Sequence, residues 1–483
     1  MLTVQILFLQ DNGINESLAL ADLSAVLRNA GHQVTLVLGD EEDDLVARLR
    51  AGDPGLAVIP CPIAGHLRAL EDARRIKAVR PECITLLGGT YATFSPELAR
   101  LPEVDVLLLG EGEGAVLELA GRIEAGEGFE DVANLVMERD GELIQNPMRP
   151  LVEDLDELPI PDRDLYFDSY PFIARLPWKK FATGRGCFHE CGFCWNDALR
   201  EMYAGGGRFT RRKSPRRAVD EIVRVQRSHP LEHVHFSDDL FTVHPKWLEE
   251  FAPLYRSEVG LPFTCNSSIP LVTRRTTTAL AEGGCVGVGI GLECGNEDLR
   301  SAILGKTVTN DDVHEAARLV KSHGMQLSTF NMVGSPGETI DNVWETIHLN
   351  RAIGVDHVRV TIAIPMPFTR FEDDAIARGL LSERSGASRV ETLMEPEVLF
   401  DGPDKEALLN LYMLFRLAVH VPASEALVRY LIRRPHARWM QALRLWGIYE
   451  EKRITHISWL DGLRYFRHVG DPRKRTANYV TLI

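Results

Sequence analysis

Residues 184–195 read GRGCFHECGFCW, in which Cys187, Cys191 and Cys194 have the spacing Cys-x-x-x-Cys-x-x-Cys. Three thiolates on one short loop can bind three irons of a cubic iron-sulfur cluster and leave the fourth iron without a protein ligand. A small molecule can then bind that iron. Glycines interspersed among the cysteines also let the backbone approach such a group closely. The pattern therefore predicts a cluster with an open coordination site.

Two other interpretations of the cysteine loop stay open at this point. In the first, His189 completes a Cys3His set around a structural zinc ion, although such sites usually draw their ligands from two separated halves and this loop provides only one. In the second, the three cysteines are buried and only pack. The single loop and its glycines favour the cluster over both alternatives.

Composition limits the possible classes of function. The chain has 483 residues, 45% of them hydrophobic, and a formal net charge of −15, which disfavours nucleic-acid binding because phosphates would be repelled. Its 8 cysteines are too few and too irregularly spaced for a disulfide framework, so we expect a cytoplasmic protein. We also expect no transmembrane segment and no secretory leader, since no apolar run is long enough to span a bilayer.

The N-terminal part alternates buried-strand and amphipathic-helix patterns. Residues 17–29 and 67–79 have helical periodicity, and short apolar runs predict strands at residues 4–9, 33–38, 56–59, 83–87 and 104–109. This alternation predicts a parallel sheet covered by helices, an α/β domain of the flavodoxin-like, Rossmann type. Its ligand would bind beyond the carboxyl ends of the strands.

Two loops at those ends are rich in glycine. Residues 88–97, GGTYATFSPE, follow one strand, and residues 110–114, GEGEG, follow the next. Glycines permit close approach of a large ligand to the main chain, and threonine hydroxyls supply hydrogen bonds, although Gly-Gly after a strand is also a common turn. The candidate ligand-binding residues are Gly88, Gly89, Thr90, Thr93, Gly110, Glu111 and Gly112.

A second α/β unit follows a hairpin and a linker. Residues 134–144 predict a hairpin that turns at Asp140-Gly141, and an acidic, proline-bearing stretch follows it. A strand before the cysteine loop and strands at 233–236, 263–266, 286–292, 326–332 and 357–362 make six βα units, enough for a partial TIM-like barrel. The predicted domains are residues 1–128, the hairpin and linker 129–178, the barrel 179–375 and a helical region 376–483.

The predicted barrel strands end in polar residues. Asp238 and Asp239 follow the second strand, where they suit metal ligands, general bases or, for Asp239, a helix cap. Polar residues and glycines at the later strand ends suit ligand binding, but they also occur in ordinary turns and helix starts. The candidates at the next three strand ends are Asn266, Ser268, Glu293 and Gly334.

The cysteine spacing, with Phe193 directly before Cys194, resembles the radical SAM superfamily. The resemblance implies a 4Fe-4S cluster whose free iron binds S-adenosylmethionine (SAM) and cleaves it reductively to a 5'-deoxyadenosyl radical, the cofactors carrying the reaction. Lys306 would suit offsetting the SAM carboxylate, although a lone lysine is most often only solvated. The SAM-binding residues that the resemblance implies are Phe193, Asp238, Asp239, Asn266, Ser268, Glu293 and Gly334.

The stretches LLGGTYATFSPE and GEGE resemble the cobalamin-binding domain that is fused to one branch of this superfamily. One departure concerns DNGINES, residues 11–17, where many cobalamin domains have Asp-x-His-x-x-Gly and this chain has no histidine. The resemblance therefore implies cobalamin bound without a protein histidine on cobalt. A degenerate domain that holds no corrinoid is the alternative.

For function, the resemblance implies methylation of an unactivated carbon or phosphorus in a small molecule, with an electron donor such as flavodoxin or ferredoxin as partner. The alternatives are cyclisation or rearrangement without net methyl transfer, and a non-catalytic corrinoid or iron-sulfur binding protein. No catalytic side chain is assigned. Elsewhere, Arg208, Arg211, Arg212 and Lys213 are expected to form a solvated surface run, and basic, tryptophan-bearing helices are expected over residues 395–483.

Overall fold

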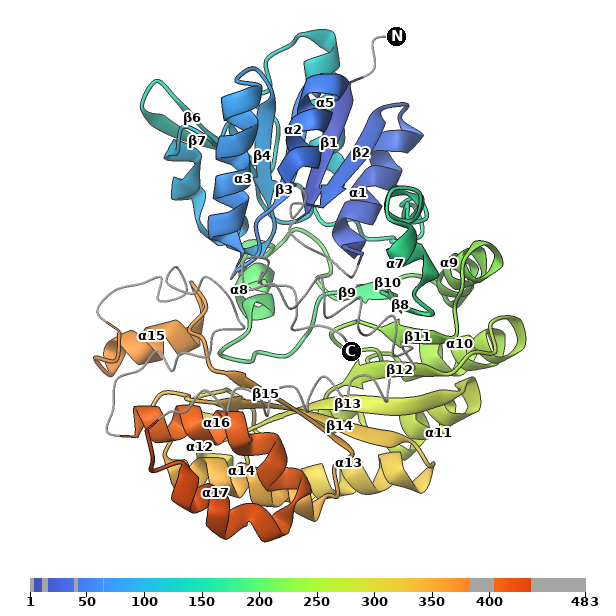
Figure 1. Ribbon diagram of the computed structural model, residues 1–483. Helices are drawn as coiled ribbons and strands as arrows, with labels where there is room; N and C mark the ends of the chain where they lie inside the picture. Colours follow the sequence, from blue (N-terminus) through green and yellow to red (C-terminus); the bar gives the residue numbers. More distant parts are fainter. Residues whose placement is uncertain (1–3, 11–15, 39–41, 64, 382–403, 436–483) are drawn as a thin grey trace.

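The computed structural model of the chain describes residues 4–10, 16–38, 42–63, 65–381 and 404–435. It contains two α/β units, one above the other, and helices near the C-terminal end cover the second unit on the side away from the first (Figure 1). The predicted fold class is thereby confirmed.

The N-terminal sheet has seven strands in the order β2-β1-β3-β4-β5-β6-β7. The parallel strands are β1 (Gln5–Gln10), β2 (Gln33–Leu38), β3 (Leu56–Pro60), β4 (Ile84–Gly88) and β5 (Val106–Leu108). The predicted hairpin is present as β6 (Leu135–Arg139) and β7 (Glu142–Gln145), and it continues this sheet in antiparallel fashion. At its turn Asp140 and Gly141 both have positive φ, 52° and 85°, as a tight hairpin turn requires. The sheet therefore extends beyond residue 128, and the predicted domain division remains a proposal.

Alternation along β1 explains why the N-terminal sheet is covered on both faces. Ile6 and Phe8 pack with residues of α1 (Leu18–Asn29) and α5 (Glu113–Ala125). Leu7 and Leu9 point to the opposite face and pack with residues of α2 (Glu42–Gly52) and α3 (His66–Val79). Because both faces are buried, β1 is a continuous apolar run, as expected for a doubly wound sheet. The carboxyl ends of the five parallel strands face the second unit (Figure 1).

The second unit is an open barrel of six parallel strands in chain order. The strands are β8 (Trp178–Phe181), β11 (His233–Phe236), β12 (Phe263–Ser267), β13 (Cys285–Glu293), β14 (Gln326–Val333) and β15 (His357–Ile362). Val234 and Phe236 on β11 pack into the apolar core beneath the outer helices, while His233 and His235 alternate to the inner face. The helices of the outer layer are α9 (Pro215–Ser228), α10 (Pro245–Glu258), α11 (Arg274–Gly283), α13 (Asn310–Ser322) and α14 (Ile340–Ala352).

The C-terminal helices pack on the outside of the barrel. α16 (Lys405–His420) contacts α14 and β15, and α17 (Glu425–Leu431) follows it. Arg429 lies 4.1 Å from the ring centroid of Trp344 on α14 and forms an ion pair with Glu425. The tryptophans of the expected basic helices, Trp439 and Trp446, lie outside the described residues. Within the described part of the chain, none of the helices combines the length and apolarity that crossing a membrane demands.

Candidate functional site

The cysteine loop connects β9 (Gly184–Arg185) to α8 (Trp195–Met202) at the carboxyl ends of the barrel strands. It is held from below by backbone bonds: the Gly192 amide donates to the Leu304 carbonyl at 3.0 Å, and the Phe371 amide donates to the Gly192 carbonyl at 2.9 Å. Gly186 has φ +81°, and a Cβ there would overlap the Phe209 carbonyl, so only glycine fits. The loop is therefore fixed before any ligand binds.

The three predicted thiol ligands lie within electrostatic reach of one another. Burial raises the pKa of Cys187 and of Cys194 to about 11, and it also raises the pKa of Cys191, which the nearby Lys306 ammonium opposes. A cluster with positive irons would supply the charge that these thiols need in order to deprotonate. The donor set and its cationic neighbour therefore fit a cluster.

A single-ion site is not formed around these thiols. Among the residues that the structure describes, no group of three or more His, Cys, Asp or Glu side chains is arranged to hold one metal ion. The Nε2 atom of His189 instead lies 2.8 Å from the Ser268 hydroxyl. Thiolates on separate irons of a cubic cluster lie farther apart than thiolates on one zinc ion. The described side chains of this loop therefore do not form a Cys3His set around one ion.

Glu293 and Lys306 form a buried ion pair beside the loop. The Nζ atom of Lys306 lies 2.8 Å from a Glu293 oxygen, 3.1 Å from the Gly291 carbonyl and 5.6 Å from the Phe193 ring centroid. Burial, the largest single effect, lowers the pKa of Lys306, but the Glu293 carboxylate together with Cys191 and Cys194 outweighs it, so the net shift is upward and the ammonium stays charged. Glu293 also has a positive φ of 62°, an uncommon conformation for a residue other than glycine. The pair fixes a carboxylate, an ammonium and an aromatic ring around one side of the cysteine loop.

The two adjacent aspartates have different surroundings. Asp238 is buried and accepts hydrogen bonds from the Thr183 amide and hydroxyl, the latter at 2.6 Å, and it lies 3.4 Å from Arg212. It therefore ties the ends of β8 and β11 together. Asp239 accepts a hydrogen bond from Asn196 Nδ2 at 3.0 Å, just beyond the cysteine loop. It does not cap a helix, because α10 starts at Pro245 with His244 at its N-cap.

The remaining predicted SAM-binding residues lie at the next strand ends. Asn266 is the penultimate residue of β12 and is half-buried, and Ser268 contacts the loop through His189. Gly334 follows β14 with φ +88°, and its amide donates to Glu338 Oε2 at 2.6 Å. Burial raises the pKa of Glu338 to about 7, although the Ser335 and Gly334 amides oppose the shift. Thr339, five residues after Gly334, is the N-cap of α14, so it starts a helix.

A cavity of about 380 Å³ lies at the carboxyl ends of the N-terminal strands. Five of the seven predicted cobalamin-binding residues line it, and its wall also includes Ala182 and Arg185 of the second unit. A Cβ on Gly112 would lie 2.6 Å from the Leu108 side chain, so the glycine keeps this space open. The lining members of the predicted set are Gly88, Gly89, Gly110, Glu111 and Gly112.

The two predicted threonines do not line the cavity. Thr93 is buried, its hydroxyl donates to the Gly89 carbonyl at 2.9 Å and accepts from the Gly110 amide at 3.1 Å. It therefore joins the two glycine-rich loops. Thr90 begins α4 (Thr90–Phe94), next to the cavity wall. Residues 11–15, most of the segment without histidine, lie outside the described residues.

Sequence reasoning missed an ion network that joins the two units. Arg185, two residues before Cys187, lies 3.1 Å from Asp22, 3.2 Å from Glu111 and 2.5 Å from Glu113. Burial raises the pKa of Asp22 to about 6 despite the neighbouring Arg185. In the sequence, this network is indicated only by the presence of two glutamates in GEGEG and of an arginine close to the first cysteine.

The predicted solvated run at residues 208–213 is wrong for its second half. Arg211 is buried and binds Glu111 through both terminal nitrogens, at 2.9 and 2.6 Å. Arg212 lies beside Asp238, and Lys213 lies 2.6 Å from the buried Glu221. Arg211 and Arg212 are shielded from solvent because each meets a carboxylate from another part of the chain, 100 and 26 residues away, whereas the half-buried Lys213 meets a carboxylate only 8 residues away. Arg208 alone is exposed as predicted.

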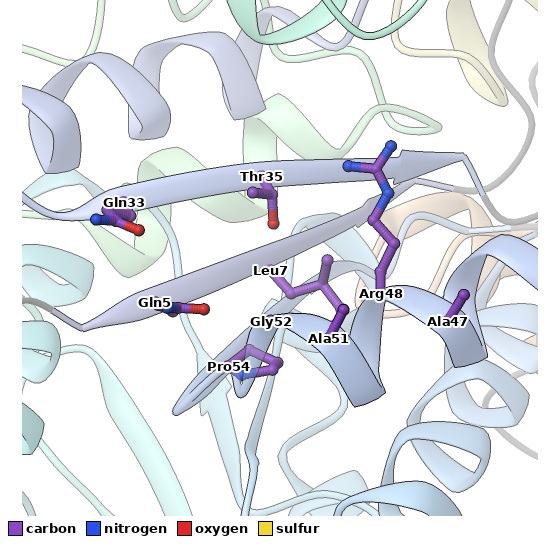
Figure 2. Close-up of a pocket in the computed structure, with 9 residues that line it drawn as sticks. All are labelled: Gln5, Leu7, Gln33, Thr35, Ala47, Arg48, Ala51, Gly52 and Pro54. Atoms are coloured by element: carbon purple, nitrogen blue, oxygen red, sulfur yellow. The ribbon is translucent and has the colours of Figure 1, made fainter.

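A second hollow of about 380 Å³ lies on the N-terminal sheet, lined by residues of β1, β2 and α2 (Figure 2). Gln5 and Gln33, at the first residues of β1 and β2, and Arg48 on α2 surround it. It therefore lies toward the amino ends of the strands, away from the cysteine loop. We assign it no ligand.

Comparison with known proteins agrees with this geometry. The sequence model of the Radical SAM superfamily matches residues 181–349, and that of the B12 binding domain matches residues 5–120. The chain belongs to the radical SAM superfamily and carries an N-terminal B12-binding domain. An uncharacterized methyltransferase of Pyrococcus horikoshii is 28% identical over 372 residues, 75% of this chain and 79% of that protein.

Two further relatives of this radical SAM protein are informative. The anaerobic magnesium-protoporphyrin IX monomethyl ester cyclase of Rubrivivax gelatinosus is 25% identical over 389 residues, 78% of this chain and 68% of that protein. The radical SAM methyltransferase TsrM of Kitasatospora setae was solved with cobalamin and a [4Fe-4S] cluster bound. Its structure matches this one with a TM-score of 0.64 at 18% sequence identity, over 78% of this chain and 75% of the TsrM chain. At that identity the likeness concerns the fold alone.

Proposed function

We propose that this protein is a cobalamin-dependent radical SAM methyltransferase that acts on an unactivated carbon or phosphorus of a small molecule. The observation that carries the proposal is the position of Arg185. It is two residues from Cys187 in sequence, and its side chain lines the glycine-walled cavity of the B12-binding domain. A cluster on the cysteines and a corrinoid in the cavity would therefore face the same space between the two units.

The residues of the chain have separate roles in this proposal. Cys187, Cys191 and Cys194 hold the cluster, and the Glu293–Lys306 pair presents a carboxylate and an ammonium to the amino and carboxylate groups of SAM. When bound, the cluster and SAM together supply the 5'-deoxyadenosyl radical, and the corrinoid supplies the methyl group. The protein orients these groups and keeps water away from them.

The glycine-rich cavity fits part of a corrinoid. Its wall is largely apolar, with Leu20, Val58 and Leu86 among the residues that line it, and this suits a flat aromatic base. Its rim carries carboxylates at Asp22, Glu111 and Glu113, which can accept hydrogen bonds from amide side chains of a corrin ring. The proposed contact residues remain Gly88, Gly89, Thr90, Thr93, Gly110, Glu111 and Gly112.

A second candidate function is cyclisation without net methyl transfer. It is supported by the similarity to the cyclase of Rubrivivax gelatinosus. That similarity covers 78% of this chain, and the similarity to the methyltransferase of Pyrococcus horikoshii covers 75%. Because one scaffold hosts both outcomes, the reaction products have to separate them.

The test uses the full chain, purified without oxygen, reconstituted with iron and sulfide, and supplied with cobalamin, SAM and a reductant. The visible spectrum should contain corrinoid and iron-sulfur bands, and 5'-deoxyadenosine should form. Cys191→Ala should abolish that product, while Cys83→Ala, at a buried cysteine of the N-terminal domain, should not. Methyl transfer to a substrate should give S-adenosylhomocysteine together with 5'-deoxyadenosine. 5'-Deoxyadenosine alone in the presence of a consumed substrate would support cyclisation instead.

A further inference from the structure

Helix α8 joins the cysteine loop to the B12-binding domain. Its first residue, Trp195, follows Cys194 directly, and Tyr203 follows its last residue, Met202. The 8 residues of the helix span about 12 Å, so its two ends reach different parts of the molecule. Figure 1 shows α8 at the boundary between the two units. The cofactor sites proposed above use neither Trp195 nor Tyr203.

The first turn of α8 contacts both units. The Trp195 ring stacks on the Phe94 ring of α4, with 5.6 Å between the ring centroids, and it packs against the apolar core of the B12-binding domain. Its Nε1 atom donates to the Pro367 carbonyl at 2.9 Å, in the segment that follows β15. Asn196 ties the same turn to Asp239 beyond the end of β11. The residue next to a proposed cluster ligand therefore contacts the other unit directly.

The far end of α8 contacts the glycine-rich loop of residues 110–114. Tyr203 is 6% exposed, and its hydroxyl accepts a hydrogen bond from the Glu111 amide at 2.7 Å. A Cβ on Gly110 would overlap that hydroxyl oxygen, so Tyr203 occupies the space that a larger side chain would need. Gly110 and Glu111 both line the cavity of the B12-binding domain. Tyr203 therefore supports the wall of the proposed corrinoid site from outside.

Polar contacts hold α8 against the cysteine loop. Arg200 in its last turn donates to the Phe188 carbonyl at 3.1 Å and forms an ion pair with Asp197 in its first turn. Asp197 also forms an ion pair with Arg370 of α15 (Arg370–Ala377), at 3.3 Å. Because α8 is tied back to the loop from which it starts, helix and loop are held as one rigid piece.

We propose that α8 sets the spacing between the iron-sulfur cluster and the corrinoid, with Trp195 and Tyr203 as the positioning residues at its two ends. This inference rests on the proposed function, in which both cofactors act on one substrate. Their separation then has to be fixed, because a displacement of about 1 Å can reduce a rate about 100-fold. Helix α8 is suited to fix it, since it starts at Cys194 and ends at the loop that lines the cavity.

The test is electron paramagnetic resonance of the full chain, reconstituted with iron and sulfide and saturated with cob(II)alamin. The relaxation rate of the cobalt signal is measured with the cluster oxidised and then reduced. A reduced, paramagnetic cluster speeds the relaxation of a nearby spin, and this enhancement falls steeply with distance. Wild type should show one defined enhancement, and Cys191→Ala should lose it. Tyr203→Phe and Trp195→Leu should each shift the enhancement and spread it over a wider range.

Cobalamin affinity and two further variants sharpen the test. Tyr203→Phe leaves the Glu111 amide without its acceptor, so cobalamin affinity should fall by about threefold to tenfold. Trp195→Phe keeps a ring to stack on Phe94, and its enhancement should stay closer to that of wild type than the enhancement of Trp195→Leu. Tyr412→Phe, at a half-buried tyrosine of α16, is the matched control and should behave like wild type.

The proposal is overturned if Tyr203→Phe and Trp195→Leu, both saturated with cobalamin, keep the enhancement of wild type, or if wild type with both cofactors shows none. Should Trp195→Leu fail to hold a cluster, Tyr203→Phe decides alone, because it removes only a hydroxyl group. Wild type without bound cobalamin would overturn both this proposal and the proposed function.

Substrate-free cleavage of SAM, measured on the same preparations, separates this inference from the proposed function. Altered enhancement in the two variants, without SAM cleavage by wild type, would remove the function and keep the role of α8. SAM cleavage by wild type, with the enhancement unaltered in both variants, would keep the function and remove the role of α8.

Discussion

Arg211→Met should loosen the glycine-rich loop of the B12-binding domain. The Arg211 guanidinium makes two bonds to Glu111 and one to the Val152 carbonyl at 2.8 Å, and its side chain is 2% exposed. Removing one partner of a buried ion pair typically costs about 3–5 kcal/mol. Glu111 keeps Arg185 at 3.2 Å and is itself 20% exposed, so we expect a cost below that range, about 2–3 kcal/mol.

Hydrogen exchange measures this local effect directly. The Glu111 amide donates to the Tyr203 hydroxyl at 2.7 Å, and the Gly110 amide donates to Thr93, so both should be protected in wild type. If local opening limits exchange, about 2–3 kcal/mol corresponds to protection lower by a factor of about 30–150. Cobalamin affinity should fall in parallel, because Gly110 and Glu111 line the cavity.

Arg216→Met is the matched control for Arg211→Met. Arg216 also forms a two-nitrogen pair with a glutamate, Glu258, but both side chains are exposed. Its replacement should leave exchange in residues 108–114 and cobalamin affinity unchanged. If Arg211→Met exchanges like wild type in that segment, or if both variants lower protection equally, the Arg211–Glu111 pair does not hold the loop.

Three further predictions concern the site. Gly112→Val should reduce cobalamin affinity by about tenfold or more, because a Cβ there would lie 2.6 Å from Leu108 and the side chain would fill the cavity. An unchanged affinity in titrations followed by absorbance would contradict this prediction. Lys306→Met should lower the free energy of unfolding in urea by about 2–3 kcal/mol, because it leaves the carboxylate of Glu293 buried without its partner. It should also weaken SAM binding, and a SAM affinity equal to that of wild type by calorimetry would argue against the assigned role. Glu338 has a folded pKa of about 7 against a usual 4.5, so the folded state binds the extra proton and wild type should lose up to about 3 kcal/mol as pH rises from 4.5 to 7. The urea midpoint of wild type should therefore fall as pH rises over this range, and in Glu338→Gln it should change less with pH. If the midpoint of Glu338→Gln changes with pH as much as that of wild type, Glu338 does not have the raised pKa.

Local pattern was enough to predict most of the fold. The buried runs that become β1 to β5 and the six barrel strands are continuous apolar or alternating segments, and their bounds agree with the structure within about two residues. The cysteine loop was equally visible, because its ligands are close together in sequence. The glycines around the cavity were found because they follow two neighbouring strands.

Long-range pairing could not be predicted from one sequence. Arg211 and Glu111 are separated by 100 residues, so nothing in the local pattern distinguishes a buried arginine from a solvated one. The same reason applies to Asp238, whose partner Thr183 lies 55 residues away. Tertiary contacts decide the roles of these charged residues.

Electron-nuclear double resonance of the reduced, reconstituted protein, with SAM labelled with 15N at its amino group, measures whether SAM binds the cluster iron. Wild type should give a 15N coupling to a 4Fe-4S signal, and Cys191→Ala should give no such cluster signal. Stoichiometric zinc in place of iron and sulfide, or an iron-sulfur signal without any 15N coupling, would contradict the proposed SAM-binding cluster.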